Sequence, residues 1–176
     1  DLEPEIVNTY ELSVGPDITD SFSTRLTGFR NDFTDSVEIV NTIDSSGFSQ
    51  RIFENKSELR TQGVEVELKY DFGKGSYMGI NYTFQDGENL DSGEGFWYNP
   101  EHKGNVLANI RLTKYFNLLT NIYFEGVRNR AEGDPREEPE AFTVLDVTLI
   151  ARKFIEGLEL RASVYNVLDE EYVIAT

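Results

Sequence analysis

The sequence contains no cysteine among its 176 residues and a single histidine, His102. The lack of cysteine excludes disulfide bonds, thiolate metal sites and cysteine nucleophiles. One histidine also excludes histidine-rich metal centres and most catalytic triads, which depend on positioned imidazoles. These absences remove many of the enzyme classes that a chain of this length could otherwise belong to.

Basic residues are scarce as well. The 16 Lys and Arg face 32 Asp and Glu, and the formal net charge at pH 7 is −16. A nucleic-acid-binding protein needs a basic surface that neutralises phosphates, so this function is excluded. The longest apolar run, residues 172–175, has four residues, whereas a membrane-spanning helix needs about 20. Composition alone, with a mean hydropathy of −0.43, resembles that of a soluble acidic protein.

What the chain does have is a period of two. In one clear stretch Val64, Val66 and Leu68 alternate with Glu65 and Glu67, and successive side chains of a strand point to opposite faces. The same alternation recurs in residues 10–14, 22–26, 78–84, 106–112, 118–124, 145–149 and 158–164. We therefore expect an all-β chain of about eight two-faced strands.

The links between these strands alternate in length. Short links are expected at 15–17, 73–75, 115–117 and 155–157, and longer polar links at about 41–49, 86–101 and 127–141. This alternation predicts an antiparallel up-and-down meander with tight turns at one end and long loops at the other. The strands themselves, at roughly 10–14 residues, exceed the usual length of about 5–6.

Strand length and aromatic placement favour a membrane as the surroundings. A tilted strand of about 9–11 residues with alternating polarity spans a bilayer, and aromatic girdles lie at its interfaces. Aromatic residues gather near the short links: Tyr70, Phe72, Tyr77, Tyr115, Phe116 and Phe154. The alternative is a large soluble sandwich with one buried face. The pattern favours a segment of a transmembrane β-barrel.

Strand parity divides the side chains of such a barrel into two sets. The residues expected to face lipid are Val66, Leu68, Ile80, Ile110, Leu112, Leu149 and Leu160. Those expected to face the polar interior are Arg25, Glu65, Glu67, Arg111, Asp146 and Arg161.

Five short motifs occur in order along the chain. They are Leu2-Glu3-Pro4-Glu5 with Asn8-Thr9-Tyr10-Glu11-Leu12, Asn55 with Gly63-Val64-Glu65-Val66-Glu67, Tyr82-Thr83-Phe84-Gln85-Asp86, Asn99-Pro100-Glu101-His102-Lys103, and Asn166-Val167-Leu168-Asp169-Glu170-Glu171-Tyr172. Each also has a plain structural interpretation. Pro100 suits the end of a loop, and Asn166 and Asp169 suit a turn. In this order and spacing the motifs resemble the C-terminal barrel region of the TonB-dependent outer-membrane receptors.

The resemblance implies a transporter of the bacterial outer membrane rather than an enzyme, and it implies no cofactor. Receptors of this family close with 22 strands around a plugged lumen. Residues 1–176 would then be a partial barrel, without the plug domain and the final strand. The implied partners are outer-membrane lipid, the protein's own plug domain, a ferric siderophore or similar scarce nutrient, and TonB acting through the plug.

Two expected loops carry candidate ligand-binding residues. Trp97 and Tyr98 could stack on a planar ligand, although a role as anchors in the outer aromatic girdle is favoured. Arg128 and Arg130 could hold an anionic ferric chelate through charge-assisted hydrogen bonds. The alternative there, a solvated loop whose charges compensate one another, is favoured.

Other functions are weaker alternatives. The acidic stretch 86–94 offers oxygen ligands but lacks the spacing of a calcium-binding loop, so no metal site is predicted. A complete eight-stranded outer-membrane barrel, serving as an adhesin or anchor, would also fit the strand count. A soluble β-sandwich that binds carbohydrate through Trp97 and Tyr98 is the third possibility.

Overall fold

A computed structural model describes residues 2–43, 45–93, 95, 99–130, 135–153 and 155–173. This part of the chain is all-β. Its strands are β1 (Ile6–Val14), β2 (Asp17–Thr19), β3 (Phe22–Ile43), β4 (Ser49–Gly73), β5 (Ser76–Asn89), β6 (His102–Arg111), β7 (Phe116–Glu125), β8 (Phe142–Arg152) and β9 (Glu159–Val164). None of the described residues belongs to a helix long and apolar enough to cross a membrane.

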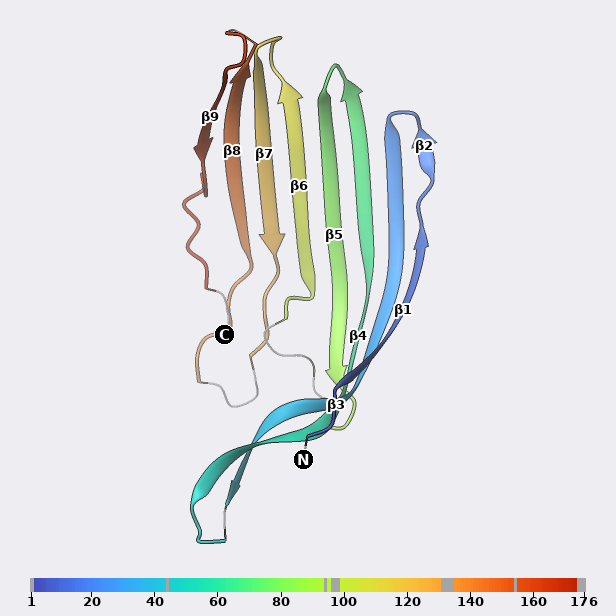
Figure 1. Cartoon of the computed structure of the whole chain (residues 1–176), viewed down its shortest axis with the longest axis vertical. Coiled ribbons are helices and arrows are strands. Elements are labelled where there is room, and N and C mark those ends of the chain that lie inside the picture. Colours follow the sequence, from blue (N-terminus) through green and yellow to red (C-terminus); the bar gives the residue numbers. More distant parts are fainter. Residues whose placement is uncertain are drawn as a thin grey trace. The chain divides into compact units, whose positions relative to one another are not determined.

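The strands form one sheet in the order β1-β3-β4-β5-β6-β7-β8-β9, and β2 pairs with β3. Every register from β5 to β9 is antiparallel. Figure 1 shows β6, β7, β8 and β9 side by side, each reversing the direction of the strand before it. The predicted antiparallel meander is confirmed.

The chain divides into two compact units. The first consists of residues 1–12, 28–63 and 86–96, and the second of residues 13–27, 64–85 and 97–176. In the first unit, Asn55 ties the N-terminal segment to β4. Its Nδ2 donates to the Glu3 carbonyl and its Oδ1 accepts from the Glu3 N–H, both at 2.8 Å. Asn55 of the second motif thus has a structural role.

The hairpin of β3 and β4 differs from the expected strand lengths. These strands have 22 and 25 residues, and only residues 44–48 separate them, so the longer polar link expected at 41–49 is wrong. Val37, Ile39, Val40 and Ile43 explain the difference, because β-branched residues suit a pleated strand and continue the pattern almost to the turn.

The short turn expected at residues 15–17 is also wrong. Gly15 and Pro16 only separate β1 from β2, which both pair with β3, and the chain reverses at Asp20 and Ser21. The Pro16 ring removes an N–H, yet its carbonyl still accepts from the Thr24 N–H at 3.2 Å. Pairing with β3 therefore resumes after a proline whose local sequence is typical of a turn.

The short links expected at 73–75 and 155–157 are confirmed. The link expected at 115–117 is misplaced, because Phe116 and Asn117 already belong to β7 and the turn lies at residues 112–115. The turn at 73–75 has an unusual backbone. Gly73, Lys74 and Gly75 are three successive residues with positive φ, at 77°, 56° and 83°. Glycine adopts this region without steric cost, whereas lysine does so rarely. The Asp71 carboxylate accepts the Gly73 N–H at 2.7 Å and fixes the entry to the turn.

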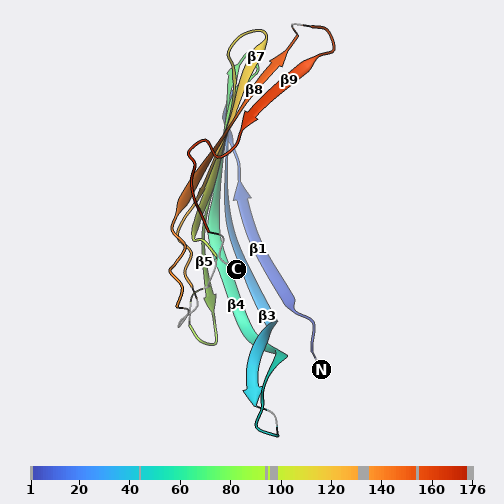
Figure 2. The same cartoon turned by 90° about the vertical axis from the view of Figure 1, so that its left-hand side faces the viewer.

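Very few apolar side chains are buried. Among the described residues, only Phe142 (7% exposed) and Ile150 (5% exposed) are buried hydrophobics. Figure 2 views the second unit close to edge-on and shows its strands as one layer. A sandwich would bury one face of the sheet against a second sheet, so the soluble β-sandwich does not describe this fold.

The last motif forms an ordered turn, as its asparagine predicts. The Asn166 side chain donates to the Glu170 carbonyl and accepts the Glu170 N–H, both at 3.0 Å, and the Asn166 N–H donates to the Asp146 carboxylate at 2.9 Å. Asn166 and Asp169 both have positive φ, at 49° and 53°, which asparagine and aspartate tolerate better than most residues.

We expect Asn166→Ala to lower the free energy of unfolding by about 1–3 kcal/mol, because two side-chain hydrogen bonds are lost and alanine is strained at this φ. Urea titration of the protein folded into lipid vesicles measures the change. Asn129→Ala, at an exposed loop position, is the matched control. Equal unfolding midpoints for the two variants would contradict the assigned role.

Candidate functional site

The candidate site is the polar face that β5 to β9 present together. Antiparallel registers place directly paired residues on the same face. One row of this face runs Tyr77, Asn109, Leu119, Thr148 and Ser163 across the five strands. The rows on either side add further polar groups: Asn81, Asn105, Arg111, Asn117, Asn121, Asp146 and Arg161.

Amides and hydroxyls join neighbouring strands on this face. The Asn105 Nδ2 donates to the Asn121 Oδ1 at 2.6 Å, and the Asn117 Nδ2 donates to the Asn109 Oδ1 at 3.3 Å. The hydroxyls of Thr148 and Ser163 share a hydrogen bond at 2.9 Å. The face is therefore a hydrogen-bonding surface suited to water or to a polar polypeptide.

The opposite face is apolar. One of its rows runs Ile110, Leu118, Leu149 and Ala162, and the row beside it pairs Ala151 with Leu160. Leu149 and Leu160 are 40% and 52% exposed, because no described segment covers them. The predicted assignment of Ile110, Leu149 and Leu160 to one face, and of Arg111, Asp146 and Arg161 to the other, is confirmed.

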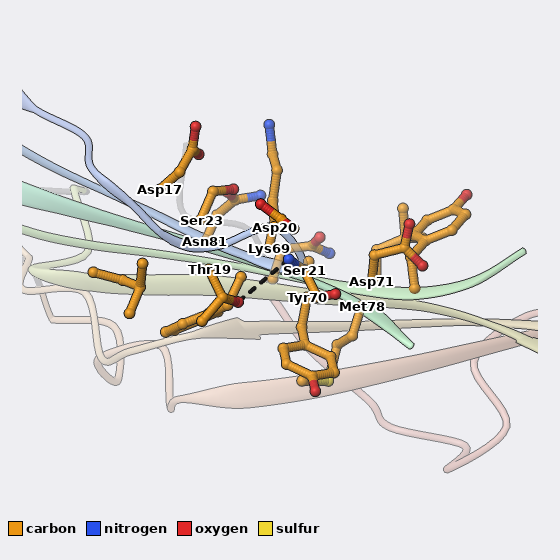
Figure 3. Close-up of a pocket in the computed structure, with 16 residues that line it drawn as sticks. Asp17, Thr19, Asp20, Ser21, Ser23, Lys69, Tyr70, Asp71, Met78 and Asn81 are labelled. Carbon is orange, nitrogen blue, oxygen red and sulfur yellow. Dashed lines mark hydrogen bonds between the residues drawn. The ribbon is translucent and has the colours of Figure 1, made fainter. Parts of the chain in front are cut away.

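A hollow of about 900 Å³ lies near the short-turn end of β3 to β6, within the second unit. Figure 3 shows Asp17, Lys69 and Asn81 on one side of the strands, with Tyr70 and Met78 on the other. Arg25, Glu67 and Lys69 line a smaller groove together with Asp17 and Ser23. The predicted interior residues Arg25 and Glu67 thus share one side of the sheet.

The loop end of β7 carries a compact charged group. Glu125 is only 4% exposed, and its carboxylate accepts from the Arg128 Nε at 2.5 Å and from the Tyr123 hydroxyl at 2.6 Å. Lys103 lies opposite Glu125 in the register. The hydrogen bond from Arg128 to Glu125 raises the pKa of the Arg128 guanidinium above its ordinary value.

Two of the four predicted ligand-binding residues lie in the described part of the chain. Arg128 and Arg130 lie in the connection between β7 and β8, and the Arg130 Nε donates to the Glu137 carbonyl at 2.7 Å. Both arginines thus hydrogen-bond to nearby residues of the chain. Trp97 and Tyr98 lie outside the described residues. Ligand binding by all four stays a prediction.

Sequence reasoning missed two aromatic groups at the loop end. On the apolar face, the Tyr82 hydroxyl and the His102 Nδ1 are 2.6 Å apart, and the Phe84 ring centroid lies 5.2 Å from that of His102. Elsewhere the rings of Phe142 and Tyr172 stack with centroids 4.3 Å apart. The first group was visible in the sequence as even-numbered aromatics beside a proline step, whereas the second joins residues too distant for a local signal.

No metal centre can be assigned within the described ranges, where no three His, Cys, Asp or Glu side chains gather in a metal-binding arrangement. The second unit therefore presents one polar face and one apolar face. Figure 1 shows its short turns at one end of the strands, and at the other end β7 finishes and β8 begins.

Comparison with known proteins agrees with this geometry. The family model described as "TonB dependent receptor-like, beta-barrel" matches residues 1–167. An iron-regulated outer membrane virulence protein of Vibrio cholerae serotype O1 is 25% identical over 187 residues, covering 97% of this chain and 28% of that protein. The chain thus spans less than a third of this relative's length.

Solved structures share the fold. The ferric-catecholate import receptor Fiu of E. coli K12 superposes with a TM-score of 0.76 at 20% identity, covering 98% of this chain and 25% of that one. The copper transporter OprC superposes with a TM-score of 0.79 at 14% identity, covering 98% and 28%. The chain belongs to the TonB-dependent receptor β-barrel family and is part of a protein of the bacterial outer membrane.

Proposed function

We propose that the chain forms part of the barrel wall of an active transporter that takes up ferric siderophores or similarly scarce nutrients. The observation that carries the proposal is the separation of a polar and an apolar face through the continuous registers of β5 to β9. The apolar face meets lipid, and the polar face lines the barrel interior.

The proposal includes the rest of the receptor. A 22-stranded transporter has a plugged lumen, and we infer that a plug domain and a closing strand belong to the same protein outside residues 1–176. Transport would be energised by TonB acting on the plug. The wall's own part is static, because it holds the plug, excludes lipid and presents loops to the cell exterior.

Iron is the favoured cargo. The Vibrio cholerae relative is named as iron-regulated, and Fiu is named as a receptor for ferric catecholates. OprC, with the same fold, is named as a copper transporter. Since one barrel architecture serves different cargoes, specificity must come from loops and plug rather than from the strand faces.

Uptake by cells tests the proposal. A strain that lacks the full-length receptor should lose accumulation of ⁵⁵Fe supplied as its ferric siderophore, and the wild-type receptor should restore it. The same receptor in a strain without TonB should bind the ferric siderophore but not import it. Import that persists without TonB would overturn the energised mechanism. If cells without the receptor still took up every tested ferric chelate at the normal rate, the proposal of a ferric siderophore as cargo would be overturned.

The loop aromatics give a second test. We expect the double change Trp97→Ala and Tyr98→Ala to weaken binding of an aromatic ferric siderophore about tenfold or more, because stacking on planar groups would be lost. Equilibrium binding of the radiolabelled chelate to whole cells measures this. Tyr115→Ala, in the short turn between β6 and β7, removes an aromatic residue as a control. Unchanged binding with reduced receptor stability would assign the pair to the outer girdle instead.

A further inference from the structure

Six basic side chains gather at the short-turn end of the second unit. Lys74, Arg111, Lys114, Arg152, Lys153 and Arg161 line a hollow of about 460 Å³. They come from the turns after β4, β6 and β8 and from the strands beside them. The cluster contains six of the chain's 16 basic residues, so it concentrates positive charge in a chain that is otherwise strongly acidic.

The registers show which face carries the cluster. Arg111, Asn117, Ile150 and Arg161 form one row across β6, β7, β8 and β9. This row belongs to the polar face, next to the row of Asn109 and Thr148. The cations therefore point away from the lipid-facing side, and a bilayer phospholipid is not their natural partner.

The charges of the cluster are only partly compensated. Glu159 forms ion pairs with two arginines: its Oε2 lies 3.1 Å from the Arg152 Nε, and its Oε1 accepts a hydrogen bond from the Arg161 Nε at 2.6 Å. Arg111 donates to the carbonyls of Lys74 and Thr113, at 3.1 and 3.2 Å, which are neutral acceptors. The residues that line the hollow include no carboxylate. A surplus of positive charge thus remains on the polar face.

The spread of the cations indicates the size of the partner. Strands lie about 4.8 Å apart, so Arg111 on β6 and Arg161 on β9 are separated by roughly 14 Å. A single phosphate or carboxylate cannot contact both. An extended polypeptide advances about 3.3–3.6 Å per residue, so a segment of four or five residues with several carboxylates matches the row.

We propose that this basic cluster is the docking site of an acidic segment of the receptor's own plug domain, held at the short-turn end of the barrel interior. In outer-membrane barrels the short turns face the periplasm, so the site lies where the plug meets that side. The inference rests on the proposed function only in taking the chain as the wall of a plugged barrel. The partner follows from charge complementarity and from the interior position of the row.

Zero-length crosslinking of the full-length receptor in outer-membrane vesicles tests this directly. A carbodiimide joins lysine amines to carboxylates that touch them, and mass spectrometry locates the joined residues. We expect Lys74, Lys114 and Lys153 to be joined to Asp or Glu of the plug domain of the same polypeptide. The yield should fall when salt is raised to about 1 M, where the screening length is only about 3 Å.

A charge-reversed pair sharpens the test. In the variant K114E/K153E, crosslinks from Lys74 to the plug should fall about tenfold, since like charges then face the acidic segment. The control R51E/K56E reverses two charges at exposed positions of β4, in the first unit, and should leave the yield unchanged.

The outcomes separate this inference from the transport proposal. Crosslinks confined to the barrel strands, or to a second polypeptide, would overturn docking of the plug, and so would an absence of crosslinks. The wild-type map gives this answer even if a variant fails to assemble. Ferric siderophore binding is measured on the same vesicles, so normal binding without the crosslinks overturns the docking site alone.

Discussion

Val147→Arg is expected to lower the free energy of unfolding by about 2–4 kcal/mol, the cost of an arginine facing lipid near the middle of a bilayer. Val147 lies at the centre of β8, and its register partners Thr120 and Val164 are on the apolar face. Urea titration of the receptor in phosphocholine vesicles, followed by tryptophan fluorescence, gives the value.

Thr148→Arg is the matched control. It places the same side chain at the next residue of β8, which lies on the polar face. Its expected cost is only about 1 kcal/mol, from loss of the hydrogen bond between the Thr148 and Ser163 hydroxyls. Equal costs at the two positions would mean that the two faces meet the same surroundings. The barrel wall described above would then be wrong.

Glu125→Ala is expected to destabilise the protein by about 2–4 kcal/mol, because it removes a buried carboxylate and leaves the Arg128 guanidinium without its ion-pair partner. The Arg128 side chain is only 17% exposed, so water replaces the lost carboxylate poorly. Changing both Glu125 and Arg128 to alanine should cost less than the sum of the two single changes, because the pair is lost only once.

Glu140→Ala, at an exposed position in the same connection, should change the unfolding midpoint little. A double-mutant cycle on Glu125 and Arg128 isolates the pairwise energy. If the cycle shows no coupling, the ion pair does not order the connection, and Arg128 becomes a stronger candidate for binding an anionic chelate. Ligand affinity of Arg128→Ala, compared with that of Arg130→Ala, then decides the matter.

The two faces of the sheet could be predicted from sequence because alternation is a local property. Once Leu145, Val147 and Leu149 alternate with polar residues, their common face follows from the geometry of one strand. Two neighbouring residues of β7 show that the type of a single residue does not predict its face. Leu119 lies on the polar face and Thr120 on the apolar face, because register rather than hydrophobicity of one residue decides the side.

The turns were predicted less well where a local signal competed with strand pairing. Gly15 and Pro16 are typical of a turn, but the carbonyl of Pro16 still pairs with β3 and the reversal comes later. The basic cluster was beyond prediction for another reason. Lys74, Arg111 and Arg161 are far apart in sequence, and only the registers of five strands bring their positions to one end of one face.

The scarcity of buried apolar side chains makes the bilayer a thermodynamic component of this protein's folding. In water, the apolar residues of each strand would have nothing to cover them, so the sheet gains little by forming before it meets lipid. Folding and insertion are then a single event. Lipid acts on the equilibrium as a ligand does on a soluble protein, because only the folded chain binds it, and the folded fraction rises with the amount of bilayer present.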